Sequence, residues 1–373
     1  MATASNYTSF VSKHPPTFQW FWNSASDSWS GDEQWQNYTD IENEIIEDAY
    51  SAKKTEVEID GDYVISFEHQ IQYKKSATDK QRPVKRVQFN RDRSNDHLRE
   101  ERFWLPIILA PTSQPPGHQP ETRDPLDRLL KSAQFRNAYH ELELKNTPKT
   151  IANVVESAAA GIITEGTTLG KTSEAEWLAQ RLLSVKHFGT HVVANLFSRI
   201  APEIGKTCIY LYTKESFWYK LINRVLRAPE TIKRDQVLTL GPFCWLLYEY
   251  LIHNYTTDVL VVYRGLTVTD EQRQQVMKPT LQFPSFTSTS RNREKAEQFG
   301  NTLLIIDLNV KYRVAKKYYD NVKCGANISH LSDFPNEEEF LIWPGRYFHF
   351  VKEEYDNVKK KHVIYLKSSE ENH

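Results

Sequence analysis

The chain has 373 residues, of which 39% are hydrophobic, 12% aromatic and 25% charged, and its formal net charge is −1. This length suggests two or three domains with sizeable cores. The balanced charge excludes a global bias toward nucleic acid or anionic membranes, so any charge-driven recognition must be local.

Segments that would direct export or membrane insertion lack the usual features. The first residues, MATASNYTSFVSKHPPTF, contain no basic region followed by an apolar one, so they do not form a secretory signal. The most apolar stretch, GPFCWLLYEYLI, is too short to span a bilayer and contains Glu249. Three cysteines without a C-x-x-C pair fit a reducing compartment. We therefore expect an intracellular protein, cytoplasmic or nuclear.

Residues 17–90 predict a small sheet packed on one helix. The stretch DIENEIIEDAYSA predicts a short helix with four apolar side chains on one face, Ile41, Ile45, Ile46 and Ala49. The alternation in TEVEIDGDYVISFEHQIQYKKS predicts a hairpin that turns at Asp60-Gly61. A further strand is predicted in PVKRVQFNR.

The next regions differ in composition. Residues 106–125, PIILAPTSQPPGHQPETRDP, predict an extended and mobile linker because they are rich in proline and polar residues. Residues 126–253 carry apolar side chains at spacings of three and four, which predicts helices in PLDRLLKSAQFRNAYHEL, AEWLAQRLLSVKHF, ESFWYKLINRVLR and FCWLLYEYLIHNY.

Strands dominate from residue 258 onward. They are predicted in DVLVVYRGL, FPSFTSTS, NTLLIIDLNV, EEEFLIWP, RYFHFVKEEY and HVIYLK. Helices followed by strands predict an α+β domain with a mainly antiparallel sheet. Whether the helices of residues 126–170 belong to this domain or form a small bridge stays open.

Two motifs resemble functional sites without meeting their requirements. In GTTLGKTSE only three residues separate Gly166 from Gly170, whereas a phosphate-binding loop needs four. A helix start capped by Thr172 or Ser173 is therefore favoured. In HFGTH, a helix would place His187 and His191 on one face, but Gly189 weakens that helix. No acidic third ligand is evident, so an ordinary histidine pair is favoured over a metal site.

Two polar patterns near the carboxyl end each have two interpretations. In VVYRGL, the fork of Arg264 suits bidentate phosphate contact and Gly265 lets a ligand approach the backbone, although a structural salt bridge fits equally well. In FPSFTSTSR, hydroxyl side chains crowd residues 285–290, which is common on a solvated face.

The stretch FPNEEEFLIWPG places three glutamates directly before an apolar run. In an extended chain residues two apart point the same way, so Glu337 and Glu339 share one face while Glu338 points to solvent. Two carboxylates on one face can divide labour: one stabilises a cation developing at a sugar carbon, and the other orients or deprotonates a nucleophile. An acidic loop is the alternative.

Taken together and in this order, these patterns resemble the arginine-serine-glutamate class of mono-ADP-ribosyltransferases over residues 170–367. The stretches YLYTKESFWYKLINRVLR and LGPFCWLLYEYL are similar to the helices that precede the first motif in that family. The resemblance implies a helical part followed by a mainly antiparallel two-sheet β core. It also implies NAD+ as a substrate and no metal.

The resemblance assigns a role to each motif residue. Arg264 would hold the NAD+ phosphates, and the backbone of Gly265 would bond the nicotinamide amide. Ser288 would support the nicotinamide ribose and the catalytic glutamate. Glu339 would stabilise the oxocarbenium ion as nicotinamide leaves, and Glu337 would engage the incoming arginine, because a carboxylate pairs well with a guanidinium.

Further positions follow from the same resemblance. The stretch RNREKAEQF is similar to the loop that covers the nicotinamide, where Arg291 or Arg293 would add a phosphate contact and Phe299 would stack on the ring. Phe334 would lie on the target-recognition loop. The chain lacks the signal and the disulfide pattern of secreted members, which favours intracellular targets.

The N-terminal stretches FQWFW, WQNY, IIEDAY, QIQYKK and RPVKR resemble a WWE domain, a half-barrel sheet plus a helix, with Glu47 as its glutamate. This family's pocket binds ADP-ribose or poly-ADP-ribose through aromatic stacking and polar contacts. The matching positions are Trp22, Trp35, Tyr63, Gln72 and Arg82. A purely structural or protein-binding role is the alternative.

We therefore expect a WWE domain in residues 1–100 with its core in 17–90, a linker in 101–125, and a transferase domain in 126–373. The expected function is transfer of ADP-ribose from NAD+ to a protein arginine with release of nicotinamide. The expected partners are NAD+, a protein with an accessible arginine and ADP-ribose chains, with no direct nucleic acid and no membrane. The alternatives are an NAD+ glycohydrolase and a catalytically silent ADP-ribose-binding adaptor.

Overall fold

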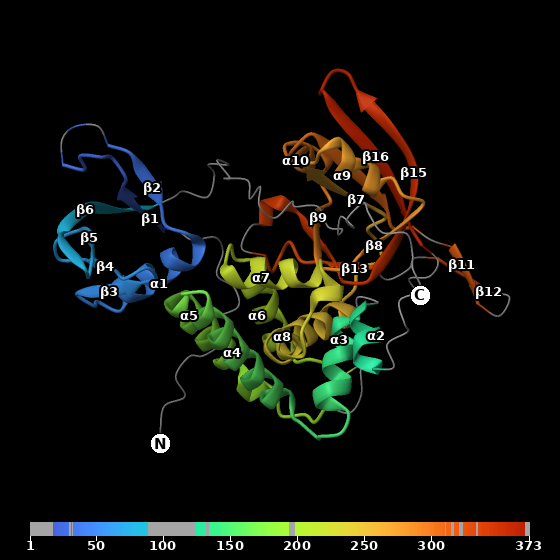
Figure 1. Cartoon of the computed structure of the whole chain (residues 1–373), viewed down its shortest axis with the longest axis horizontal. Helices are drawn as coiled ribbons and strands as arrows, with labels where there is room; N and C mark the ends of the chain where they lie inside the picture. Colours follow the sequence, from blue (N-terminus) through green and yellow to red (C-terminus); the bar gives the residue numbers. More distant parts are fainter. Residues whose placement is uncertain are drawn as a thin grey trace.

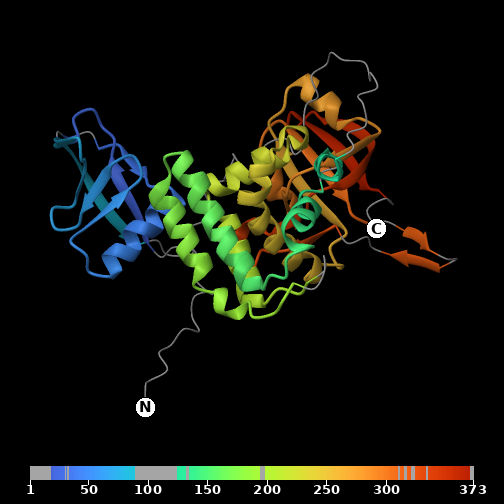
Figure 2. The ribbon, with the colours of Figure 1, turned by 60° about the horizontal axis from the view of Figure 1, so that its bottom comes forward.

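Two large sheets flank a layer of helices in the computed structural model of the chain, which also has a two-stranded sheet (Figures 1 and 2). The structure describes residues 18–29, 31, 33–88, 124–131, 134–193, 198–309, 311–314, 317–320, 324–332 and 335–369. The expected linker falls outside these residues except for its last two positions, and Phe334 lies outside them too.

The first sheet has six antiparallel strands in the order β2-β1-β6-β5-β4-β3. A capping box of Thr39 and Glu42 starts its helix α1, whose buried side packs into the core with Trp20, Ile65 and Val84. The turn at Asp60-Gly61 joins β3 to β4, as predicted. The elements are β1 (Phe18–Asn23), β2 (Trp35–Asn37), α1 (Asp40–Ser51), β3 (Glu56–Ile59), β4 (Tyr63–Ser66), β5 (Ile71–Lys74) and β6 (Ala77–Gln88).

The helical layer forms one core that runs from Leu130 to Trp343 and also includes Ile41 of α1. Gly161 allows α4 to lie against α8, because a Cβ there would come within 1.9 Å of the Thr239 carbonyl oxygen. The helices of residues 126–170 therefore pack in the same core as the strands that follow. The elements are α2 (Pro125–Lys131), α3 (Phe135–Tyr139), η2 (His140–Leu144), α4 (Ile151–Thr168), α5 (Thr172–Leu183), η3 (Lys186–Phe188), α6 (Pro202–Thr213), α7 (Phe217–Leu226), η4 (Pro229–Thr231) and α8 (Arg234–His253).

The two stretches that resemble a phosphate-binding loop and a metal site, GTTLGKTSE and HFGTH, form ordinary secondary structure and turns. The N-cap of α5 is Lys171, so the prediction that Thr172 or Ser173 caps this helix is wrong. His187 and His191 are both exposed. Within the described residues, no group of three His, Cys, Asp or Glu side chains is arranged to hold a metal ion.

The second sheet has eight strands in the order β13-β14-β9-β7-β10-β16-β15-β8. Among the strand pairs that the structure describes in this sheet, β10–β16 is parallel and the others are antiparallel. A single residue pair, Tyr263 opposite Ser290, joins β9 to β7, so the ladder consists of a three-stranded and a five-stranded part. The mainly antiparallel character and the α+β fold class are confirmed, while the two sheets that were expected are joined into one ladder by this single pair.

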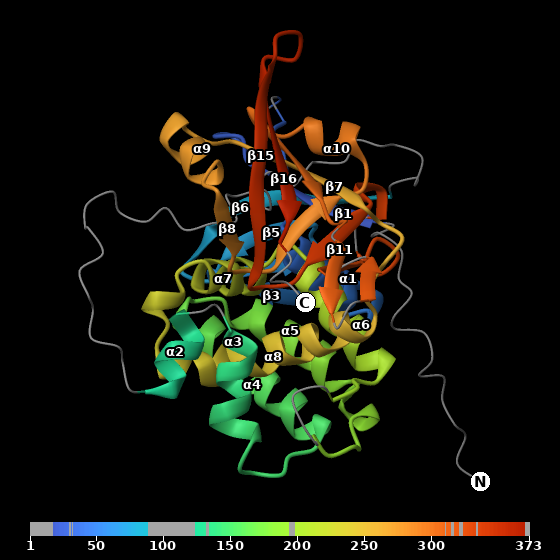
Figure 3. The ribbon, with the colours of Figure 1, turned by 90° about the vertical axis from the view of Figure 1, so that its right-hand side faces the viewer.

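The last region also contains short helices and a hairpin that protrudes. Strands β15 and β16 extend well beyond the rest of the sheet in Figure 3. The elements are β7 (Val261–Leu266), α9 (Asp270–Val276), β8 (Thr280–Phe283), β9 (Thr287–Ser290), α10 (Arg293–Glu297), β10 (Thr302–Asp307), β11 (Lys311–Val314), β12 (Lys317–Asp320), β13 (Gly325–Asn327), η5 (Pro335–Glu337), β14 (Glu339–Ile342), β15 (Arg346–Asp356) and β16 (Lys361–Ser368).

None of the helices in the described ranges is both long enough and apolar enough to cross a bilayer.

Candidate functional site

Arg264 is a buried cation on the central strand β7. Only 1% of it is exposed, between Val262 and Leu266, which are completely buried. Its Nη1 donates a hydrogen bond to the backbone carbonyl of Ser288, which ties β7 to β9. Burial lowers the pKa of Arg264 to about 10, and the nearby Glu339 is among the groups that oppose this shift. A buried arginine of this kind is suited to hold an anion.

The hydroxyl-rich strand β9 is buried along its whole length, so the interpretation as a solvated face is wrong. Thr289 donates a hydrogen bond from Oγ1 to the Phe340 carbonyl at 2.7 Å. Ser290 donates from Oγ to the Glu337 carbonyl, also at 2.7 Å. The Oγ of Ser288 is buried and has no hydrogen-bond partner among the described residues. Such a group fits a polar ligand that would complete its hydrogen bonding.

The two outer glutamates of the acidic run lie beside strand β9. Glu339 is 2% exposed and faces Ser290 across the β14–β9 ladder. Ser332 donates a hydrogen bond from Oγ to Oε2 of Glu339 at 3.2 Å. Glu337 is 8% exposed and ends the short helix η5. Both carboxylates are therefore held in the interior.

The backbone between these two glutamates is not extended. Glu338 has a φ of +49°, in the left-handed region, and η5 precedes it. Asn292 donates a hydrogen bond from Nδ2 to the Glu338 carboxylate at 3.0 Å, and Nη2 of Arg291 lies 3.6 Å from the same group. The Glu338 side chain is 39% exposed, so it reaches solvent while it contacts Asn292 and Arg291. Arg291, a predicted phosphate contact, instead forms an ion pair with Glu338.

Gly265 lies against the end of α10. A Cβ at this position would come within 2.2 Å of the Ala296 carbonyl oxygen and 2.7 Å of Cβ of Phe299. Phe299 is 5% exposed, so the aromatic ring predicted to stack on nicotinamide is next to the glycine predicted to bond it. The stretch RNREKAEQF contains the short helix α10, where Arg293 pairs with Glu297 at 2.7 Å.

Helix α7 adds three polar residues that the sequence reasoning did not single out. Tyr219 and Arg227 both affect the pKa of Arg264, so they lie close to it. Asn223 donates a hydrogen bond from Nδ2 to the Tyr212 hydroxyl at 2.8 Å. The Nε of Arg227 is buried and unpaired within the described residues. The sequence contains a signal that could have identified them. Polar residues recur every four positions along an otherwise apolar stretch, at Tyr219, Asn223 and Arg227.

In the first sheet, three of the predicted ligand-binding residues lie together. Gln72 and Arg82 are directly opposite each other on β5 and β6. The Arg82 guanidinium lies 5.6 Å from the Trp22 ring and donates hydrogen bonds to the Asn23 and Ala25 carbonyls at 2.9 and 2.8 Å. The Gln72 side chain is buried and accepts a hydrogen bond from the Tyr38 hydroxyl at 2.7 Å.

The other two residues predicted to bind this ligand, Tyr63 and Trp35, lie on different faces of the sheet. Tyr63 is 38% exposed and lies two residues from Ile65, the cross-strand partner of Gln72, so Tyr63 is on the same face as Gln72. Trp35 pairs with Asn23, the neighbour of Trp22, so the two tryptophans point to opposite faces of the sheet. The structure therefore does not bring Trp35 together with the other four residues.

Glu47 is a structural anchor of this domain. It accepts hydrogen bonds from Nε1 of Trp20 at 2.9 Å and from Arg86 at 2.6 Å. Although burial raises the pKa of Glu47, the hydrogen bonds from Arg86 and Trp20 lower it below its ordinary value. The tryptophan that contacts this glutamate is Trp20, which the sequence reasoning did not name.

Comparison with known proteins gives two family matches and a set of similar folds. A search of curated proteins finds no match. Among solved structures, the ADP-ribosyltransferase HopU1 of Pseudomonas syringae is 20% identical with a TM-score of 0.36, and the match covers 45% of this chain and 77% of that one. Exoenzyme S from Pseudomonas aeruginosa, solved with human 14-3-3 protein beta and carba-NAD, is 16% identical with a TM-score of 0.36, covering 58% and 88%. C3stau2 from S. aureus with NAD is 16% identical with a TM-score of 0.33, covering 44% and 86%.

One family match covers each of the two large sheets. Residues 18–86 match the WWE domain, and residues 204–373 match the NAD:arginine ADP-ribosyltransferases, enzymes that use NAD+ as a substrate. The chain therefore carries a WWE domain followed by a domain of the ADP-ribosyltransferase family.

Proposed function

We propose that this ADP-ribosyltransferase domain, which we extend over residues 126–373, transfers a single ADP-ribose unit from NAD+ to a protein arginine. The observation that carries this proposal is the convergence of three strands. Arg264 on β7 bonds the backbone of Ser288 on β9, and Ser288 faces Leu341, two residues after Glu339 on β14. A buried cation, a buried hydroxyl and a buried carboxylate thus lie within one small region.

We assign the phosphates of NAD+ to Arg264 and Arg227. Both guanidinium groups have buried atoms, and in a low-dielectric site a cation interacts strongly with phosphate. Arg291 would first have to leave Glu338, so its contribution would require a rearrangement of that ion pair. The backbone of Gly265 and the ring of Phe299 then form the nicotinamide end of the site.

In the proposed chemical step, the two buried glutamates have different roles. As the bond between nicotinamide and the ribose breaks, its electron pair leaves with nicotinamide and positive charge develops on the ribose. The carboxylate of Glu339, oriented by Ser332, stabilises that charge. Glu337 pairs with the target guanidinium, whose nitrogen attacks the anomeric carbon and then releases a proton.

We further propose that the WWE domain binds ADP-ribose or poly-ADP-ribose through Trp22, Tyr63, Gln72 and Arg82. Their common face and the guanidinium beside an indole ring support this, because aromatic stacking and charge-assisted contacts suit an adenine diphosphate. Trp35 is left out because it lies on the opposite face. Titration calorimetry tests this. We expect the folded Trp22→Ala variant to lose ADP-ribose binding.

The test of the transferase proposal compares wild type, Glu339→Gln and Glu338→Gln with labelled NAD+ and agmatine. Glu338→Gln is the matched control, since it removes a neighbouring carboxylate that is outside the proposed chemistry. We expect labelled adduct from wild type and Glu338→Gln, and a loss of about 100-fold or more in Glu339→Gln.

Other outcomes separate the alternatives. Nicotinamide release without adduct would indicate an NAD+ glycohydrolase or an acceptor other than arginine. The absence of turnover in folded wild-type protein would contradict the proposal and favour a silent ADP-ribose-binding adaptor.

A further inference from the structure

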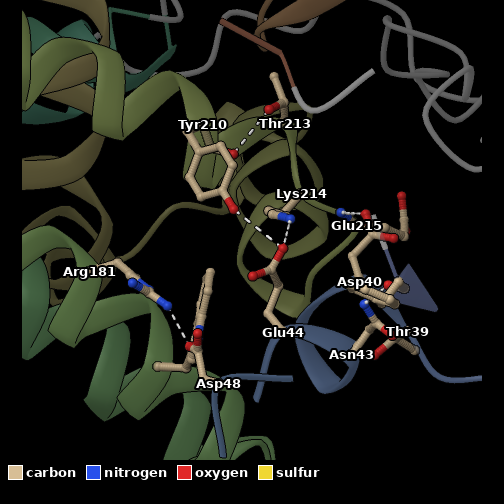
Figure 4. A network of polar contacts seen from close by, with 12 residues as sticks. Thr39, Asp40, Asn43, Glu44, Asp48, Arg181, Tyr210, Thr213, Lys214 and Glu215 are labelled. Carbon is tan, nitrogen blue, oxygen red and sulfur yellow. Dashed lines mark hydrogen bonds and ion pairs between the residues drawn. The ribbon is translucent and has the colours of Figure 1, made fainter. Parts of the chain in front are cut away.

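The WWE domain presents an acidic face to the helical layer of the transferase domain. Asp40, Glu44 and Asp48 recur every four residues along α1, so they lie on one side of the helix. Figure 4 shows these side chains pointing toward residues of α5 and of the segment that follows α6. Asp48 accepts hydrogen bonds from Nε1 of Trp177 at 2.9 Å and from the guanidinium of Arg181. The acidic face is therefore paired across the domain boundary.

The most buried contact on this face is the ion pair between Glu44 and Lys214. The Lys214 Nζ lies 2.7 Å from Oε1 of Glu44, and only 1% of the lysine side chain is exposed. Tyr210 adds a hydroxyl 3.5 Å from the same oxygen. A lysine this deeply buried needs its counter-ion, because an unpaired charge in the interior is strongly destabilising.

Backbone groups at the start of α7 make further contacts with the WWE domain. The N–H of Glu215 donates to Oδ2 of Asp40 at 2.9 Å, and Ser216 is the N-cap of α7. On the other side of this segment, the N–H of Phe217 donates to Oε1 of Glu174 at 2.8 Å. Residues 214–217 are thus held by α1 of the WWE domain and by α5.

A second carboxylate of the WWE domain supports α5 itself. The side chain of Lys171, the N-cap residue of α5, makes no capping hydrogen bond within the described part of the chain. Instead Asp60, in the β3–β4 turn, accepts hydrogen bonds from the N–H groups of Ser173 at 2.8 Å and Glu174 at 3.2 Å. The first turn of α5 is therefore capped by another domain. Asp60 fixes Glu174, and Glu174 fixes the first residue of α7.

We infer that the WWE domain is a positioning part of the transferase site, and that Glu44 and Lys214 are positioning residues for NAD+ binding. The pair fixes the start of α7, and α7 with its C-cap residue places Tyr219 and Arg227 near Arg264. The inference rests on the proposed NAD+ site, which includes Arg227. It requires no ligand on the WWE domain, because the contacts between α1, α5 and residues 214–217 are formed by the chain itself.

The experiment measures NAD+ affinity by titration calorimetry and turnover by nicotinamide release, in the full chain. Glu44→Gln and Lys214→Met each remove the ion pair while retaining most of the side-chain volume. Asp48→Asn is the matched control, since it weakens docking on the same face of α1 but contacts α5 and not residues 214–217. The double variant Glu44→Lys with Lys214→Glu restores the pair with reversed charges.

We expect Glu44→Gln and Lys214→Met to raise the Kd and the KM for NAD+ by about 10-fold, which corresponds to about 1.4 kcal/mol. The kcat at saturating NAD+ should change less than about twofold, because the catalytic glutamate is not moved. Asp48→Asn should keep the wild-type Kd, and the double variant should recover part of the affinity. If Lys214→Met fails to fold, Glu44→Gln alone gives the answer.

Two results would overturn the inference. One is an unchanged Kd for NAD+ in folded Glu44→Gln. The other is a rise in Asp48→Asn that equals the rise in Glu44→Gln, since general loosening of the domains would then explain both. Failure of the proposed function is a separate result, seen as wild-type protein that neither binds NAD+ nor releases nicotinamide.

Discussion

Several ionisable side chains that are almost fully buried connect one helix or strand of this molecule to another. Arg264, Lys214, Glu174 and Glu249 are each no more than 5% exposed. Each has a specific partner: the Ser288 carbonyl, Glu44, the Phe217 N–H and Arg136. Because burying a charge is unfavourable without such a partner, these residues make the arrangement around them specific.

Glu174 predicts a measurable pH dependence. Burial raises its pKa to about 7, although the hydrogen bond from Phe217 and the charge of Lys171 lower it, and Asp60 and Glu42 raise it further. Between about pH 4.5 and 7 the folded chain holds a proton that the unfolded chain has lost. Its contribution to the free energy of unfolding is therefore fully present below about pH 4.5 and is lost as the pH rises through 7. This loss amounts to roughly 3 kcal/mol.

The test is urea denaturation of wild type and Glu174→Gln at pH 5 and pH 8. The glutamine cannot ionise and still accepts the Phe217 hydrogen bond through its amide oxygen, so the variant should lose less stability than wild type as the pH rises. The exposed Glu176→Gln, on the same helix, is the control. An identical pH dependence in wild type and Glu174→Gln would contradict the assignment.

At the scale of elements, helix α5 depends on a cap from outside its own segment. Its first N–H groups donate to Asp60 of the WWE domain. Helices α1, α4 and α9, by contrast, start with local capping boxes. The local sequence therefore suffices for the starts of those three helices, whereas α5 requires the domain interface.

Replacing Asp60 by alanine should lower the stability of the full chain by about 1 kcal/mol, the usual cost of removing an N-cap. Thermal unfolding followed by circular dichroism at 222 nm would measure it. Asp79→Ala is a suitable comparison, because Asp79 is an exposed carboxylate on β6 of the same domain. Equal shifts in the two variants would argue against the cap.

At the scale of the whole molecule, an ion pair joins the early helices to the centre of the helical layer. Nε of Arg136, on α3, donates to Oε1 of Glu249, on α8, at 2.5 Å. Glu249 is completely buried, and the arginine side chain is only 10% exposed. Helix α3 is thus held to α8 by an ion pair that lies in the interior.

Arg136→Met should destabilise the chain by about 3 kcal/mol, because it leaves a buried carboxylate without its cation. Adding Glu249→Gln should recover part of this loss. A double-mutant cycle in urea measures the coupling between the two positions. Additive effects of the two substitutions would show that the pair contributes little.

Much of the fold follows from local patterns. The alternation of residues 55–76 and the Asp60-Gly61 turn predicted the β3–β4 hairpin, and helical periodicity predicted α7 and α8. The order of Arg264, Ser288 and Glu339 was sufficient to identify the family. The pairing of Glu338 with Arg291 was missed, because a left-handed residue between two buried glutamates has no signature in the sequence.

The sequence by itself predicted many of the elements and the residue types of the candidate site, since helix and strand periodicity depends on neighbours two to four positions away. It did not single out helices α4 and α9. Only the tertiary structure decided which distant groups meet. It put Trp35 on the opposite face from Trp22, buried the serines and threonines of β9, and set Asp60 and Glu44 against α5 and Lys214. The physical reason is that strand register and the burial of charge depend on the packing of segments far apart in the chain.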